Sequence, residues 1–115
     1  MIIVDTSVLV SFLILSDSSH NKAKQLLLKI KVEDMMMPEY IYTEVLNVLR
    51  AKFSDEYCTK FEQLISDWNI SIVFADSAII RLSNHYFFQF KKLSFTDCLI
   101  LASAKLNNYE VATFD

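Results

Sequence analysis

The chain has 115 residues, of which 53% are hydrophobic, 13% are aromatic and none is glycine, and its formal net charge is −3. This composition suits one folded domain and excludes general disorder, and the net negative charge argues against a protein that coats nucleic acid through bulk electrostatics. Walker-type and dinucleotide-binding loops need glycines that let the backbone approach phosphate, so the absence of glycine excludes both.

The predicted elements alternate between strands and helices along the chain. Short apolar runs rich in β-branched residues predict strands, and apolar residues at helical spacing after Asp or Ser caps predict helices. In chain order we expect a strand at 2–5, helices at 6–16 and 17–30, a strand at 35–37, helices at 38–53 and 54–68, a strand at 70–74, helices at 76–90 and 94–106, and a strand at 111–114.

This alternation predicts the fold class. Strands that alternate with helices, with no hairpin signal between them, indicate parallel pairing and right-handed crossovers. The segment 70–74 alternates poorly between apolar and polar residues, as expected for a strand covered on both faces. We therefore predict an α/β protein, with a three-layer α/β/α architecture, a central parallel sheet of four or five strands and a single domain over residues 1–115.

The sequence also constrains where in the cell the protein is located. The longest apolar stretch near the start, 8–15, is interrupted by Ser11 and is far shorter than the roughly 20 residues that a membrane span needs. No basic residue precedes it, which argues against a signal peptide, so we expect a cytoplasmic protein without membrane contact.

Cys58 and Cys98 are isolated, lack zinc-ligand spacing and are expected to be buried apolar residues.

Four acidic residues stand where apolar segments end or turn inward. Asp5 follows the first strand, Glu44 lies within a helix, Asp97 opens another helix and Asp115 closes the last strand. In a parallel sheet with crossover helices, such carboxylates converge at the carboxyl edge of the sheet, where open α/β folds bind ligands. Clustered carboxylates repel one another, and their hard oxygens suit Mg2+ or Mn2+. We therefore predict a divalent-metal site.

Each acid also has a purely structural interpretation. Asp5 has the position of an N-cap, and Ser94 and Asp97 have the spacing of a capping box. Glu44 lies on the border of the apolar face of its helix, although an exposed glutamate paired with a lysine is the simpler alternative. Asp115 ends the sequence, where fraying is the alternative.

Four segments, in order, resemble the successive acidic motifs of PIN-domain ribonucleases, most closely those of VapC-type toxins of toxin-antitoxin pairs. The segments are residues 2–9, 38–49, 93–102 and 112–115. This resemblance spans the whole chain, and four motifs in the same order are more specific than any one of them. One departure is that family members usually continue beyond the fourth motif, whereas this sequence ends at Asp115.

The resemblance implies a parallel sheet between helical layers and an endoribonuclease dependent on Mg2+ or Mn2+. It also implies an RNA substrate, an inhibitory antitoxin protein as partner and, in many members, a homodimer. The residues that it implies for the metal-binding and catalytic site are Asp5, Glu44, Asp97 and Asp115, with Thr6, Ser7 and Thr113 as supporting hydroxyls.

The chemistry of phosphodiester hydrolysis agrees with such a site. A metal-bound water supplies the nucleophile near neutral pH, and the cation neutralises the charge that accumulates on the phosphoryl oxygens. Two alternatives remain open at this point. One is a receiver-like metal-binding signalling domain, which would also need a lysine at a later strand end, and the other is a catalytically inactive PIN-like domain that serves as a protein partner.

Overall fold

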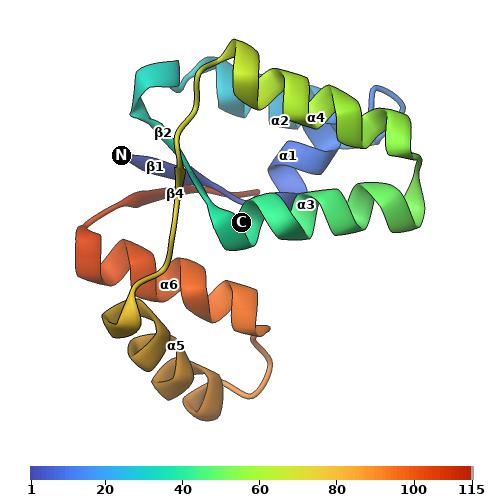
Figure 1. The fold of residues 1–115 in the computed structure, drawn as a ribbon. Coiled ribbons are helices and arrows are strands. Elements are labelled where there is room, and N and C mark those ends of the chain that lie inside the picture. Colours follow the sequence, from blue (N-terminus) through green and yellow to red (C-terminus); the bar gives the residue numbers. More distant parts are fainter. Residues whose placement is uncertain (115) are drawn as a thin grey trace.

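Four short parallel strands form the sheet at the centre of the computed structural model, which describes residues 1–114 (Figure 1). Their order across the sheet is β3-β2-β1-β4, and all three neighbouring pairs are parallel. The strands are β1 (Ile2–Val4), β2 (Met35–Pro38), β3 (Ile72–Val73) and β4 (Glu110–Ala112). A parallel sheet of this size, with helices on both sides, confirms the predicted fold class.

The strand order places a change of direction at β1. From β1 the chain adds β2 and then β3 on one side, and after two more helices it returns to add β4 on the other side of β1. The carboxyl ends of β1 and β4 therefore flank a topological switch point, the usual ligand position in open α/β sheets. Receiver domains have the order 2-1-3-4-5, so the observed order contradicts the receiver-like alternative.

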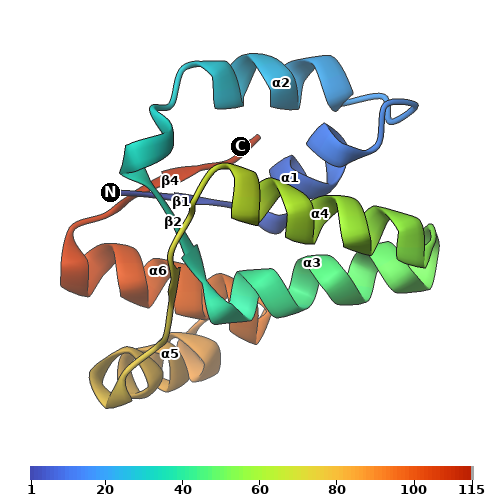
Figure 2. The same cartoon turned by 45° about the horizontal axis from the view of Figure 1, so that its top comes forward.

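Helices cover both faces of the sheet. In Figures 1 and 2, α5 and α6 pack together on one side, whereas α2 and α4 lie on the other. Within residues 1–114, each of these helices is too short or too polar to cross a bilayer. The helices are α1 (Thr6–Leu13), α2 (His20–Leu28), α3 (Glu39–Lys52), α4 (Asp55–Asp67), α5 (Ser77–Gln89) and α6 (Phe95–Asn107), with a short 3-10 helix η1 (Val32–Asp34) before β2.

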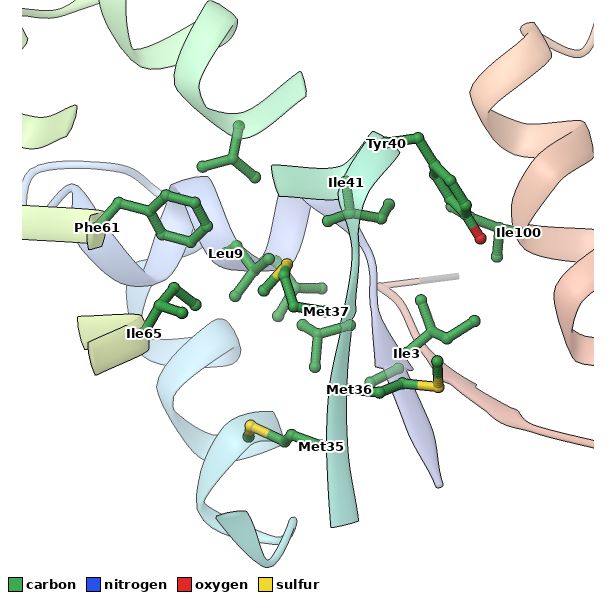
Figure 3. Packing of buried hydrophobic residues seen from close by; sticks show 14 of the residues in the cluster. Ile3, Leu9, Met35, Met36, Met37, Tyr40, Ile41, Phe61, Ile65 and Ile100 are labelled. Atoms are coloured by element: carbon green, nitrogen blue, oxygen red, sulfur yellow. The ribbon is translucent and has the colours of Figure 1, made fainter. Parts of the chain in front are cut away.

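The core lies on both faces of the central strands. Met35, Met36 and Met37 on β2 are all buried. Met36 points to the α6 side of the sheet, and its two neighbours point to the opposite side (Figure 3). Side chains alternate along a strand, so three consecutive buried residues show that β2 is covered on both faces. On the side of Met37, Leu9 faces Phe61 and Ile65 from α4 (Figure 3).

Two predicted strands differ from the observed ones. β3 is shorter than the predicted 70–74 and is not covered on both faces, because Ile72 and Phe74 are exposed at the edge of the sheet. β4 ends at Ala112 rather than at 114, because its partner β1 ends at Val4 and the chain then turns into α1. Cys98 is buried as predicted, and Cys58 is only partly buried.

Two phenylalanines offer a matched test of this packing. Phe61 is 0% exposed in the core, and Phe88 on α5 is 68% exposed. We expect Phe61→Ala to lower the free energy of unfolding by about 3–5 kcal/mol because it leaves a cavity. At protein concentrations that keep the chain monomeric, Phe88→Ala should change it by less than about 0.5 kcal/mol. Urea unfolding followed by circular dichroism measures both, and equal losses would contradict the described core.

Candidate active site

Asp5, Glu44 and Asp97 line a single cavity of about 530 Å3. Asp5 follows the carboxyl end of β1, Glu44 lies in the second turn of α3, and Asp97 lies in the first turn of α6. All three side chains are partly buried. Three acids that are distant in sequence are thus brought to one hollow at the carboxyl edge of the sheet, where the sequence predicted that they would converge.

Asp5 is fixed by hydrogen bonds from both sides of the switch point. It is the N-cap of α1, and its Oδ1 accepts a hydrogen bond from the backbone N–H of Thr6 at 2.8 Å. Its Oδ2 accepts hydrogen bonds from the hydroxyls of Ser7 at 3.4 Å and of Thr113 at 3.3 Å. The capping role and a place in the cavity are therefore compatible in this residue.

Asp97 likewise caps a helix and lines the cavity. The capping box is present, because Ser94 Oγ accepts a hydrogen bond from Asp97 N at 3.1 Å and Asp97 Oδ2 accepts one from Ser94 N at 3.2 Å. Among residues 1–114, no hydrogen bond is made to Asp97 Oδ1. One carboxylate oxygen thus holds the start of α6, and the other has capacity for a ligand.

Glu44 has no such structural task. Within the described part of the chain its carboxylate makes no hydrogen bond and no ion pair, which contradicts the alternative of an exposed glutamate paired with a lysine. A second polar group beside the cavity also lacks a partner, since the buried Thr6 Oγ1 makes no hydrogen bond. Because polar groups that lose water are costly unless they are paired, both favour a ligand in this cavity.

Comparison with a model of the PIN domain family gives a match over residues 2–115. The chain belongs to the PIN domain family. This membership confirms the family resemblance seen in the acidic motifs. A comparison with curated protein sequences gave no match.

Solved structures resemble the fold of this PIN domain at low sequence identity. VapC20 of Mycobacterium tuberculosis, described as a sarcin-ricin loop cleaving toxin, is 16% identical with a TM-score of 0.88, over 100% of this chain and 90% of that one. A toxin-antitoxin complex from Klebsiella pneumoniae is 21% identical with a TM-score of 0.74, over 96% of this chain and 83% of that one. FitAcB from Neisseria gonorrhoeae is 18% identical with a TM-score of 0.75, over 100% of this chain and 88% of that one.

The donor set of this PIN domain suits a hard divalent cation. Carboxylate oxygens are preferred by Mg2+ and Mn2+, and Mg2+ usually takes one or two protein carboxylates while keeping several waters. In residues 1–114 no three Asp, Glu, His or Cys side chains lie close enough together to bind one ion directly. An ion bound here would therefore be held directly by at most two of these carboxylates.

The fourth predicted acid, Asp115, lies outside the described residues. The residue two positions earlier, Thr113, does reach the site through its bond to Asp5. A further cavity of about 270 Å3 lies along this side of the sheet, and it shares Asp5 and Asp97 with the first. This second cavity extends the candidate site towards Leu93 and Leu101.

Three cavity residues were not expected from sequence. Asp17 lies in the turn before α2, where its Oδ2 accepts a hydrogen bond from Ser19 N at 2.9 Å, and it also lines the acidic cavity. Lys52 and Phe53, at the C-terminal end of α3, line the same cavity. No local signal in the sequence marks these residues as part of the site.

A buried hydroxyl pair joins the two helices that carry Glu44 and Asp97. Tyr40 Oη on α3 lies 2.7 Å from Ser103 Oγ on α6 and donates to Leu99 O at 3.3 Å, and Figure 3 shows its ring directed towards Ile100. Burial raises the pKa of the Tyr40 hydroxyl above its usual value of 10.0. This neutral hydroxyl pair holds α3 against α6.

We expect this pair to behave as a coupled unit. Tyr40→Phe and Ser103→Ala should each cost about 1–3 kcal/mol of unfolding free energy, because each leaves a buried hydroxyl or carbonyl with fewer partners. The double variant should cost less than the sum by at least about 0.5 kcal/mol. Tyr40→Phe combined with Thr59→Ala, at an exposed position on α4, serves as the additive control. Additive costs for Tyr40 and Ser103 in urea unfolding would contradict the coupling.

Proposed function

We propose that this PIN domain is a metal-dependent endoribonuclease that hydrolyses RNA phosphodiester bonds. Asp5, Glu44 and Asp97 are its proposed metal-binding and catalytic residues, with Asp115 as a fourth. The observation that carries the proposal is the shared cavity, which Asp5 after β1, Glu44 on α3 and Asp97 on α6 all line beside the switch point of the sheet. Their chemistry suits Mg2+ or Mn2+.

When bound, the cation supplies an activated water and neutralises charge on the phosphoryl oxygens. Asp5 contributes an oriented carboxylate, because one backbone amide and two hydroxyls fix both of its oxygens. Asp97 offers Oδ1 while its other oxygen caps α6. Glu44, whose carboxylate has no protein partner in residues 1–114, would accept hydrogen bonds from waters around a bound ion and so orient them.

The biological role proposed here is that of a toxin restrained by an antitoxin protein. This rests on fold likeness to VapC20, described as a toxin, and to the toxin-antitoxin complex from Klebsiella pneumoniae. An RNA-cleaving toxin of this kind would act in the cytoplasm. The proposal includes a homodimer, because Phe87, Phe88 and Phe90 expose apolar rings on and just after α5, as protein-contact surfaces do.

Substitutions that keep the helix caps but remove charge test the active site. Asp5→Asn and Asp97→Asn retain an oxygen that accepts the capping hydrogen bonds. They should therefore remain folded and lose at least about 100-fold in cleavage, because an amide binds a divalent cation far more weakly. The measurement is cleavage of labelled RNA with added Mg2+ or Mn2+, compared with EDTA.

The matched control is Ser94→Ala, which removes the capping hydroxyl and keeps the Asp97 carboxylate. It should cost about 1 kcal/mol of stability and retain cleavage. Undiminished cleavage by purified Asp5→Asn would refute the assignment. If the unmodified folded chain neither cleaves RNA nor binds Mg2+ or Mn2+ in calorimetry, the alternative of a catalytically inactive PIN domain replaces the proposal.

A further inference from the structure

The acidic cavity is the middle part of a longer groove. A cavity of about 510 Å3 runs along the exposed face of α3, and it shares Glu44, Val48 and Lys52 with the acidic cavity. On the other side, the cavity beside β4 shares Asp5 and Asp97 with it. Three adjoining cavities with carboxylates at the centre suit an extended polymer better than a small compact ligand.

Lys52 supplies the positively charged side chain of this groove. It is the only lysine or arginine among residues 1–114 that lines any of the three cavities. It is exposed, and no carboxylate in the described part of the chain lies within ion-pair distance of its ammonium group. Arg50, on the same last turn of α3, differs because its guanidinium pairs with Asp55 at 2.9 Å and lines none of these cavities.

Phe53 supplies an aromatic surface beside this charge. It follows the last residue of α3, is 43% exposed and lines the acidic cavity. Its ring is held edge-on against Tyr57, with 6.1 Å between the ring centroids. A lysine that attracts phosphate and an aromatic ring that stacks on a base are the two elements of single-strand recognition.

We propose that Lys52 and Phe53 form a substrate subsite that binds the RNA strand beside the scissile phosphate. This inference rests on the proposed function, because it takes the acidic cavity as the place of cleavage. Lys52 contacts a phosphate and Phe53 stacks on a neighbouring base. Asn47, one turn before Ala51 on the same cavity wall, presents an exposed amide to the same strand. The structural alternative for Lys52 is stabilisation of the C-terminus of α3.

Binding in EDTA tests the subsite independently of catalysis. The probe is a 5′-fluorescein-labelled single-stranded RNA oligonucleotide, followed by anisotropy at several salt concentrations. Lys52→Ala should weaken binding several-fold and reduce the slope of log K against log salt by about 0.7, the value for one phosphate contact on a single strand. Arg50→Ala, which changes net charge equally, should bind as the unmodified chain does. If the unmodified chain and Lys52→Ala bind RNA equally, or if neither binds, the proposal is overturned.

The aromatic contact has a different signature. Phe53→Leu should weaken binding by roughly tenfold through loss of stacking and leave the salt slope unchanged, because no charge is removed. Phe74→Leu is the control, since Phe74 is 77% exposed beside the edge strand β3 and lines none of the three cavities. Equal affinities for Phe53→Leu and the unmodified chain would remove Phe53 from the subsite.

Cleavage kinetics separate this inference from the proposed function. With Mn2+, Lys52→Ala should raise KM and leave kcat nearly unchanged, the pattern for loss of an interaction made equally in ground and transition states. A fall in kcat at unchanged KM would overturn the binding role. If the unmodified chain cleaves no RNA, the proposed function fails, whereas the EDTA binding experiment still decides whether Lys52 and Phe53 bind the strand.

Discussion

The pairing of β1 with β4 is the contact on which the candidate site depends. Asp5 N donates to Ala112 O at 2.9 Å, and Thr113 Oγ1 donates to Asp5 Oδ2 at 3.3 Å across 108 residues of sequence. β4 lies at the edge of the sheet beside β1, and the chain reaches it from β3 through α5 and α6. This pairing places the start of α6, and with it Asp97, beside Asp5 at the switch point.

The same carboxylates hold the local structure and face the cavity. Asp5 and Asp97 each accept a backbone N–H at the start of a helix, where the macrodipole favours negative charge. Capping therefore restricts the rotamers of both side chains without a cation. Their mutual repulsion across the cavity is then a cost that a divalent ion removes. Glu44, which caps nothing, is held instead through α3 and the contact of Tyr40 with Ser103.

The sequence predicted the parts of this molecule that depend on local patterns. The strand at 35–37, the cap at Asp5 and the capping box at Ser94 follow from residue type and spacing. The edge position of β3 and the ends of β4 did not follow, because pairing partners set them. Asp17 and Lys52 were missed for the same reason, since tertiary packing brings their helix ends to the cavity. The place of Asp115 stays a prediction.

The spacing along α3 is compatible with the proposal that a chain with net charge −3 binds a polyanion beside an acidic centre. Glu44, Val48 and Lys52 follow one another at intervals of four residues and line both cavities. Eight residues of helix separate the backbones of Glu44 and Lys52 by about 12 Å along the axis. The proposed phosphate contact of Lys52 and the proposed cation site would therefore occupy different parts of the groove. The net charge of the chain therefore describes neither the acidic centre nor the positive charge at Lys52.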